Sequence, residues 1–441
     1  MIQRLYPLLI VVILLLAILS LPFSRKMRKG FLPRVLAGRT LRAAFVRRDS
    51  THPLVWFHAA SAGELLQAEP IMARLREQNI QLMVSLSSIS AVGWLDRFMD
   101  WPEVIWSGLL PPDFPWSVRG WLRGMQPTAV VHMQVDLWPG FVTTTHDAGI
   151  PQVLMAARVG RRGNYRARFP MGNIYRALFG RMSLILCATE SDREGLLMVV
   201  PEQERLKVGG DPGVETVLNR VREGEISPKL KTWAAAHPVL VLGSIWPTDE
   251  DIVLSGLVRV ATEFPELRII AAPHDPDGSH LQKLSQQLTN LGTIRLSELE
   301  SSDNLSSDDS LTRVVLVDGV GRLASLYKLG AMAYVGGGFG SGVHNVAEPA
   351  AIEQAVLFGP RHGNSAVAKL LLEAKGACLV NDRTMFENIL RDWMKNPKSR
   401  RSAGVAAKGV VELLADGAEI SYQALLDTVP GLAASYNKEE A

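Results

Sequence analysis

Residues 334–351 read YVGGGFGSGVHNVAEPAA, and this stretch decides the fold of the second half of the chain. The apolar residues 331–335 predict a buried strand, and five glycines follow it. Glycine tolerates positive φ and lets the backbone approach a ligand closely. Asn345 then begins a predicted helix. Because free N–H groups at a helix N-terminus attract negative charge, the pattern predicts an anion site, although Asn345 and Glu348 also fit a simple helix cap.

The rest of the chain repeats this alternation of strand and helix. Short apolar runs predict strands at residues 54–58, 80–86, 129–133, 152–156, 184–188, 239–242, 268–272, 314–317, 331–335 and 355–358. Turn residues and helical patterns follow these runs, which is typical of parallel sheets with helices on both faces. The polar segment 220–231 reads as a linker between two halves. We therefore expect two α/β domains facing each other across a cleft, at residues 24–222 and 223–441, with helices at 385–429 packing on the second.

The N-terminus predicts a membrane anchor. Residues 5–23 form an apolar, uncharged segment that is just long enough to span a bilayer. No small-x-small cleavage site precedes the basic run that follows, so a retained anchor over residues 1–23 is favoured over a cleaved signal peptide. Nine Lys and Arg and no acidic residue lie between 24 and 48, which places the body of the protein in the cytoplasm. Two roles remain open for these charges: they only set the orientation of the anchor in the membrane, or they also contact anionic lipid. Because the net charge is only +3, the remaining chain is acidic overall and does not suggest a nucleic-acid-binding protein.

Glu64 is the first candidate catalytic residue. It follows a predicted strand and the small residues 59–63, AASAG, and falls in the first turn of a predicted helix. The positive end of a helix stabilises an anion there. The small neighbouring residues leave space around this carboxylate, which is what a general base needs if it is to reach a substrate hydroxyl. Glu64 also fits the plainer role of a residue that interacts only with the helix dipole or caps the helix.

In the second half, four loops follow predicted strands. They begin at Gly243, Pro273, Gly319 and Gly336 and would meet at the carboxyl edge of a sheet, where open α/β sheets bind ligands. The chain has no Gly-Lys-Ser/Thr phosphate loop, and no acidic residue stands at the spacing that a dinucleotide site needs. ATPase-type hydrolysis and dinucleotide-dependent redox chemistry are therefore disfavoured.

Several motifs, taken in chain order, resemble those of the 3-deoxy-D-manno-octulosonic acid (Kdo) transferases of lipid A biosynthesis, which are GT-B glycosyltransferases. They are 57–64 FHAASAGE, 136–139 DLWP, 243–250 GSIWPTDE, 272–274 APH, 318–323 DGVGRL and the stretch 336–349. The resemblance covers nearly the whole chain and is nearest to the Bacteroidetes-type members, which share the GGGFGxGxHN signature.

The resemblance implies a GT-B fold of two Rossmann-like domains behind a membrane anchor. It implies an inverting enzyme that needs no metal and no cofactor. The reaction would move Kdo from CMP-Kdo to a lipid A precursor, lipid IVA, during lipopolysaccharide biosynthesis, with the catalytic body on the cytoplasmic face of the inner membrane.

The resemblance also assigns site residues. Glu64 and Asp136 would be catalytic, and Ser61, Gly63 and Arg158 would bind the acceptor. The donor site would be formed by Gly243, Ser244, Pro273, His274, Val320, Gly321, Arg322, Gly340, Gly342, His344, Asn345 and Glu348.

Three residues depart from the family pattern. Gln134 stands where a second acid is common, Gly213 where many members have Lys or Arg, and His274 where Arg is usual. Two alternatives therefore stay open: a GT-B transferase that uses another nucleotide sugar, such as a UDP-sugar, and a membrane-anchored homologue with weakened catalysis.

Overall fold

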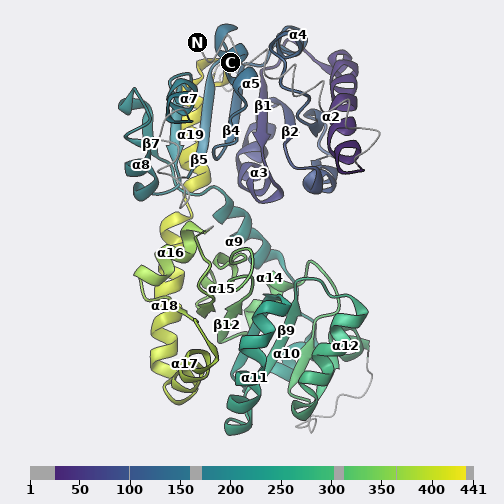
Figure 1. Cartoon of the computed structure of the whole chain (residues 1–441), viewed down its shortest axis with the longest axis vertical. Helices are drawn as coiled ribbons and strands as arrows, with labels where there is room; N and C mark the ends of the chain where they lie inside the picture. Colours follow the sequence, from purple (N-terminus) through teal and green to yellow (C-terminus); the bar gives the residue numbers. More distant parts are fainter. Residues whose placement is uncertain (1–24, 99, 159–170, 302–311, 364, 434–441) are drawn as a thin grey trace. The chain divides into compact units, whose positions relative to one another are not determined.

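The computed structural model describes residues 25–98, 100–158, 171–301, 312–363 and 365–433. The chain forms two compact units, one of residues 1–216 and 415–441 and the other of residues 217–414 (Figure 1). Each unit contains one seven-stranded sheet in which all paired strands are parallel. The predicted α/β class and its two-part organisation are confirmed.

The first sheet has the strand order β3-β2-β1-β4-β5-β6-β7. Its strands are β1 Leu54–Ala59, β2 Gln81–Leu86, β3 Val104–Leu109, β4 Ala129–Met133, β5 Gln152–Ala157, β6 Leu184–Cys187 and β7 Leu206–Val208. Every residue of β1 and β4 is buried, because helices cover both faces of the sheet. The order reverses between β1 and β4, which is the switch point where open α/β sheets bind ligands.

The second sheet has the order β10-β11-β9-β8-β12-β13-β14. Its strands are β8 Val239–Ile245, β9 Arg268–Pro273, β10 Thr293–Arg295, β11 Val314–Leu316, β12 Met332–Val335, β13 Ala355–Phe358 and β14 Ala377–Leu379. Its switch point lies between β8 and β12, so the glycine stretch that follows β12 begins at this place.

Helices surround both sheets. The first unit has α2 Arg25–Ala43, α3 Ala62–Glu77, α4 Pro115–Met125, α5 Pro139–Asp147, α7 Met171–Phe179, α8 Glu190–Leu196, α19 Gly417–Thr428 and α20 Pro430–Ala433, with 3-10 turns η1 Ala44–Arg47, η2 Ile89–Phe98 and η3 Gln203–Arg205. The second has α10 Pro228–Ala234, α11 Pro247–Glu263, α12 Gly278–Gln287, α13 Leu296–Ser301, α14 Leu323–Leu326, α15 Ala347–Ala350, α16 Ala366–Glu373, α17 Arg383–Lys395 and α18 Pro397–Leu414, with η4 Thr289–Leu291 and η5 Tyr327–Leu329. Proline at the first helical position begins α4, α5, α10 and α11, where its missing N–H costs no hydrogen bond.

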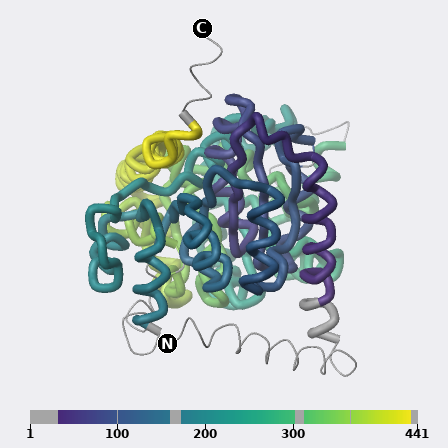
Figure 2. The backbone as a smooth tube through the Cα atoms, turned by 90° about the horizontal axis from the view of Figure 1, so that it is seen from above, coloured from purple at the N-terminus to yellow at the C-terminus, as the bar shows by residue number. Residues whose placement is uncertain are grey.

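The expected domain limits need two corrections. The division falls at residues 216/217, inside α9 Gly213–Glu223, and the expected linker 220–231 is largely helical because α10 begins at Pro228. The last helices also do not belong to the second unit. Tyr422 and Leu425 of α19 are buried in the apolar core around β1 and α3, and the return of the chain can be followed in Figures 1 and 2.

The predicted anchor, residues 1–23, lies outside the described residues. Among the residues that the structure describes, no helix combines the length and the apolar character needed to cross a membrane.

Replacing Leu425 with Ala tests the place of α19. Leu425 is 0% exposed, so its truncation should destabilise the first unit by about 2–5 kcal/mol. Hydrogen exchange should become faster across α3 and α19 and stay unchanged across α11. Leu413→Ala, at a side chain that is 86% exposed, is the matched control and should alter neither. Faster exchange confined to the second unit would contradict the assignment.

Candidate active site

Glu64 and Asp136 follow the two strands that flank the first switch point, β1 and β4. Ser61 is the N-cap of α3, and its hydroxyl accepts a hydrogen bond from the backbone N–H of Glu64 at 3.4 Å. Glu64 Oε2 accepts from the N–H of Ala60 at 2.6 Å. One carboxyl oxygen of Glu64 therefore bonds to the backbone at the start of α3, as the capping role predicts. The side chain of Ser61 also bonds to this carboxyl and, like the N–H of Ala60, lowers its pKa.

The protonation of Glu64 differs from the expectation. Burial raises its pKa to about 7, although the hydrogen bond from Ala60 lowers it, and the negative charge of Asp136 raises it further. The helix N-terminus alone predicts a carboxylate that stays ionised. Here the loss of hydration outweighs that effect, so Glu64 exchanges its proton near neutral pH. A pKa close to the working pH is what a general base needs.

Asp136 has the opposite character. Its Oδ2 atom lies 3.1 Å from His58 Nε2 and 3.3 Å from Trp138 Nε1, and it also accepts from the hydroxyl of Ser87. Burial raises the pKa of Asp136, but the hydrogen bond and charge of His58, with Ser87 and Trp138, bring it down to about 2. The two carboxyl groups of the candidate site thus have pKa values that are far apart.

The predicted acceptor residue Arg158 belongs to a network below Glu64. It pairs with Asp211 Oδ2, and its positive charge lowers the pKa of Glu64. Asp211 Oδ1 accepts from Gln67 Nε2 at 2.8 Å and from the N–H of Gly213 at 3.1 Å.

Both N-terminal departures from the family pattern lie in this network. Gln134 Nε2 donates to Gln67 Oε1 at 3.0 Å. A Cβ on Gly213 would come within 2.8 Å of Gln67 Cγ, so Gln67 excludes a larger side chain at that position unless it moves. The two departures are therefore linked sterically through Gln67. Gly63, the remaining predicted acceptor residue, is exposed in the first turn of α3.

In the second unit the glycines of the 336–342 stretch serve the protein backbone first. A Cβ on Gly336 would collide with the backbone of Ser244, and one on Gly338 would lie 2.5 Å from the N atom of Gly359. Gly337 and Gly342 have φ of +89° and +140°, which side chains rarely adopt. Gly340 has neither constraint, since a Cβ there would be in ordinary contact with Thr248 Oγ1 at 3.4 Å and the carbonyl oxygen of Gly337 at 3.6 Å. Close approach to a ligand is thus not the reason for most of these glycines.

The predicted helix after this loop is short. α15 spans only Ala347–Ala350, and Asn345 Oδ1 accepts from the N–H of Ala347 at 3.1 Å. Within the part of the chain that the structure describes, the N–H groups of Asn345, Val346 and Glu348 are found in none of the loop's hydrogen bonds. Burial raises the pKa of the Glu348 carboxyl, which Asn345 Nδ2 approaches at 3.2 Å.

Three aromatic rings gather at the same edge of the second sheet. Trp246 Nε1 donates to His344 Nε2 at 2.7 Å, and the ring of His274 stacks on both, with centroids 4.2 Å from Trp246 and 4.6 Å from His344. His274 directly follows Pro273 at the carboxyl end of β9. A cavity of about 410 Å³ adjoins the rings and is lined by Ile245, Trp246, Pro247, His274, Asp275, Asp277, Ser279, His280 and Lys283.

Other predicted donor residues have different surroundings. Gly243 is required by packing, because a Cβ there would overlap the hydroxyl of Tyr327, and Ser244 turns the chain with φ of +51°. Val320 is 81% exposed, and Gly321 has φ of +81°. Arg322 is held by Glu300 through two hydrogen bonds of 2.5 and 2.9 Å, so its charge is already paired.

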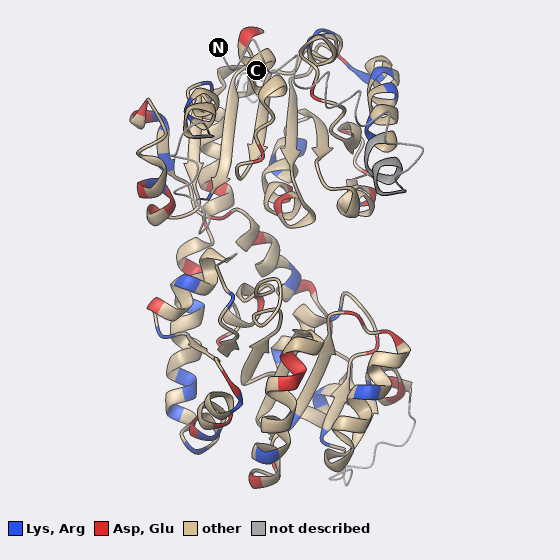
Figure 3. Ribbon diagram, in the orientation of Figure 1, with Lys and Arg blue, Asp and Glu red and all other residues tan. Residues whose placement is uncertain are grey.

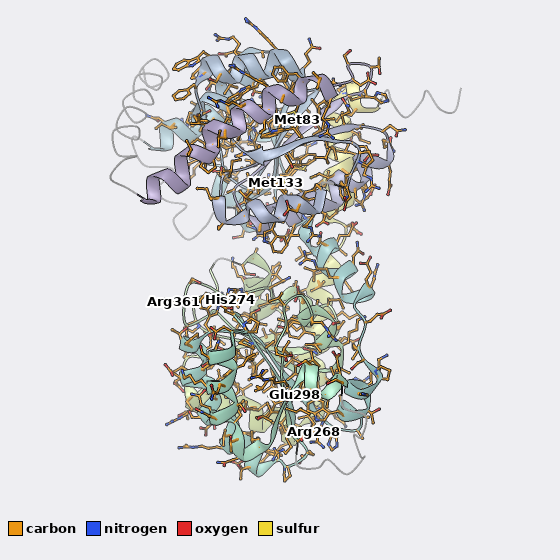
Figure 4. The ribbon with its side chains drawn as sticks, turned by 90° about the vertical axis from the view of Figure 1, so that its right-hand side faces the viewer. Met83, Met133, Arg268, His274, Glu298 and Arg361 are labelled. Carbon is orange, nitrogen blue, oxygen red and sulfur yellow. The ribbon has the colours of Figure 1, made fainter. Side chains whose placement is uncertain are left out.

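The sequence analysis did not assign several residues that the structure brings to these edges. His58, Ser87 and Trp138 bond to Asp136, and Trp246 joins the ring cluster. Arg361 follows β13, and its Nη1 atom donates to the carbonyl of Gly340 at 2.7 Å. Figure 4 shows Arg361 and His274 at one end of the second unit, and Arg268, which begins β9, at the other. The available signal was that His58 ends a predicted strand and that Ser87, Trp138, Trp246 and Arg361 lie one to five residues after one.

Known proteins match the chain in sequence. Residues 37–213 match the family model described as 3-deoxy-D-manno-octulosonic-acid transferase (kdotransferase). The 3-deoxy-D-manno-octulosonic acid transferase of Haemophilus influenzae is 22% identical over 81% of this chain and 83% of its own length. The enzyme of the same name from Chlamydia muridarum is 26% identical over 78% of this chain and 79% of its own length.

Solved structures also match the fold. A crystal structure of UDP-N-acetylglucosamine 2-epimerase aligns over 88% of this chain and 98% of its own, with a TM-score of 0.60 and 13% identity. UDP-GlcNAc 2-epimerase from Neisseria meningitidis aligns over 85% of this chain and 100% of its own, with a TM-score of 0.61 and 12% identity. At these identities the likeness shows the fold alone, which is GT-B-like with two Rossmann-like units.

The pKa of Glu64 predicts a pH dependence of stability. A carboxyl whose pKa is raised from 4.5 to about 7 in the folded state contributes stability that is complete below pH 4.5 and is lost as the pH rises through about 7. Glu64→Gln is neutral throughout, so it should gain stability relative to the wild type between these pH values. Urea unfolding of both proteins from pH 4 to pH 8 measures the difference.

Glu190→Gln is the control, because Glu190 also lies in the first turn of a helix but its side chain is 58% exposed. A stability difference between Glu64→Gln and the wild type that does not change with pH would show that Glu64 is hydrated and that folding does not raise its pKa.

Proposed function

Since residues 37–213 match the 3-deoxy-D-manno-octulosonic acid (Kdo) transferase family model, we propose that the chain belongs to this family and transfers Kdo from CMP-Kdo to a lipid A precursor, with inversion at the anomeric carbon. The observation that carries the catalytic part is Glu64, a half-buried carboxyl with a pKa of about 7 at the switch point of the first sheet. The acceptor would be lipid IVA, and the product would enter lipopolysaccharide biosynthesis.

The reaction needs one base and one stabilised leaving group. An acceptor hydroxyl oxygen attacks the anomeric carbon, the bond from that carbon to the phosphate oxygen breaks, and CMP leaves with the electron pair. Glu64 takes the proton of the hydroxyl. Ser61, Gly63 and Arg158 lie around the start of α3 or act on Glu64, which supports their assignment to the acceptor side.

We assign the donor to the carboxyl edge of the second sheet. CMP carries one phosphate, and the backbone N–H groups of Asn345, Val346 and Glu348 offer donors to it. Arg361 adds a positive charge beside Gly340, whereas Arg322 is occupied by Glu300. The rings of Trp246, His274 and His344 form a planar surface beside this loop that suits a base or a sugar.

We also propose that residues 1–23 anchor the protein in the inner membrane with its catalytic body on the cytoplasmic face. The sequence supports this through its apolar segment and the basic run after it. Arginines lie along α2 from residue 34 onward (Figure 3), and Leu32, Val35 and Leu36 of the same helix are exposed. A helix that exposes both kinds of side chain suits contact with an anionic membrane surface.

Two other functions compete with this one. A GT-B transferase of a UDP-sugar would share the fold, as the two epimerase structures do. A homologue with weakened catalysis is suggested by Gln134 and Gly213, but both take part in the ordered network that holds Arg158. Donor preference and turnover separate the three.

Glu64→Gln should lower turnover of CMP-Kdo roughly 10²- to 10⁴-fold, because the amide keeps the shape of the side chain and cannot accept the proton. The affinity for CMP should stay unchanged, since we assign the donor site to the second unit. Turnover is measured by mass spectrometry of the lipid product, and CMP affinity by calorimetry on the same preparation. In the wild type, the acid limb of the rate profile should lie near pH 7. Near-normal turnover in the variant would remove Glu64 from the mechanism.

The glycine loop offers a matched pair for the donor site. Gly342→Ala forces a side chain into φ of +140° and should strain the loop by roughly 1–3 kcal/mol, weakening CMP binding. Gly340→Ala has room for its methyl group and should bind CMP as the wild type does. Calorimetry with CMP and with UDP measures both effects. Stronger binding of UDP than of CMP would favour the UDP-sugar alternative. If both variants bound CMP as tightly as the wild type does, the loop would not belong to the donor site.

A further inference from the structure

A chain of hydrogen bonds runs from the interior of the first sheet to Asp136. The indole Nε1 of Trp56 donates to Ser85 Oγ at 2.9 Å, and Ser85 Oγ lies 2.8 Å from His58 Nδ1. His58 Nε2 then lies 3.1 Å from Asp136 Oδ2. The side chain of His58 is 0% exposed and that of Asp136 is 25% exposed, so the chain connects the buried sheet to the open site.

All three donors to Asp136 reach the same oxygen. His58, Ser87 and Trp138 each bond to Oδ2, while no bond to Oδ1 is found among the described residues. Three donors on one oxygen fix the plane of the carboxylate as well as its position. Arg34 of α2 supports this arrangement, because its guanidinium lies 5.6 Å from the ring centroid of Trp138 and its charge acts on Asp136.

His132 shows that a buried histidine at this edge does not by itself need a carboxylate. It is paired in register with His58 across β1 and β4 and is equally buried. Its Nε2 atom bonds to Gln152 Oε1 at 3.1 Å instead, and burial lowers its pKa to about 3. The Nε2 atom of His132 thus bonds to a neutral amide, whereas the Nε2 atom of His58 bonds to Asp136.

We propose that His58 is a positioning residue for the transfer reaction: it holds Asp136 as a fixed negative charge beside Glu64, and this charge keeps Glu64 basic enough to accept the proton of the attacking hydroxyl. The proposal rests on the function proposed above. It gives Asp136 an electrostatic task and leaves the proton transfer itself to Glu64.

The charges around the two carboxyl groups agree with this division. Asp136, which follows β4, raises the pKa of Glu64, and Arg158, which follows β5, lowers it, both after the larger effect of burial. Since burial alone would also raise the pKa of Asp136, the bonds from His58, Ser87 and Trp138 are what keep it ionised. Without His58, two buried carboxyl groups would compete for one proton.

The first test measures the titration of Glu64 and does not depend on activity. The stability gain of Glu64→Gln over its parent begins near the pKa of an unfolded glutamate and levels off at the pKa of folded Glu64, and the pH at which it levels off should be lower in an Asp136→Asn parent than in the wild type. An unchanged pH would show that the charge of Asp136 does not reach Glu64 and would overturn the proposal.

The second test is a double-mutant cycle on turnover. His58→Phe fills the space but loses the donor, and it should lower kcat roughly 10- to 100-fold in the wild type and leave kcat nearly unchanged in the Asp136→Asn background. His132→Phe, the matched control, should have equal effects in both backgrounds. If His58→Phe does not fold, His58→Gln is used instead, because the glutamine amide keeps a hydrogen-bond donor. The smaller loss of kcat expected for His58→Gln must also vanish in the Asp136→Asn background. Equal losses in both backgrounds would mean that His58 is only structural.

Failure of the proposed function is distinguishable from failure of this inference. A wild-type protein that does not turn over CMP-Kdo would refute the transferase function, while the titration of Glu64 would still decide whether Asp136 acts on it. An active wild type with an additive cycle would retain the function and refute the role of His58.

Discussion

The burial of both faces of each parallel sheet is the constraint on which the rest of the structure depends. Side chains in the central strands point into apolar layers, so charged groups can be hydrated only where the strands end. The candidate catalytic residues and the ring cluster of the second unit all follow the carboxyl ends of β1, β4, β8, β9 and β12. The strand order in each sheet then selects the pair of strands between which a ligand can enter, because the helices on the two sides of the switch point diverge.

Polar groups that remain inside the first sheet must find partners there. Ser85 and His58 are fully buried and hydrogen-bonded, since an unpaired polar group in an apolar layer is costly. His132 bonds through Nε2, while its Nδ1 atom has no partner among the described residues. For His58 and Ser85 this requirement produces a chain that ends at Asp136. The same loss of hydration acts on Glu64 in the opposite direction, because among the described residues only the N–H of Ala60 and the side chain of Ser61 bond to its carboxyl in place of water. Two carboxyl groups on adjacent strands thus acquire opposite protonation preferences from the number of donors around each.

The glycine stretch of the second unit follows from the same crowding. The loop after β12 passes between the loops after β8 and β13, and Gly336 and Gly338 meet those backbones directly. Gly337 and Gly342 supply the positive φ that folds the loop back on itself, as the bonds from Gly340 and Gly342 to the carbonyl of Gly337 show. The density of glycine at this position therefore reflects contacts within the protein as much as any contact with a ligand.

The sequence by itself determined the α/β class, the two-part organisation and the ten strands named in advance, because each of those strands is a short apolar run bounded by turn residues. The edge strands are different. β3, β7 and β10 were not predicted, and β14 is likewise absent from the predicted set. Their residues are partly exposed, as in Leu206–Val208 and Thr293–Arg295, so hydrophobic pattern does not distinguish them from loops.

The tertiary structure alone decided which groups act on one another. Glu64 was predicted from its motif, but its pKa depends on burial and on Asp136, which lies far away in the sequence. Arg322 was expected at the donor site, yet Glu300 pairs with it, and Arg361 approaches the glycine loop instead. α19 returns to the first unit because its buried face, with Leu425, fits the core near β1 and α3. A local pattern determines which element forms and where a polar side chain leaves it, whereas hydration, charge pairing and the partner of an apolar face depend on residues that only folding brings together.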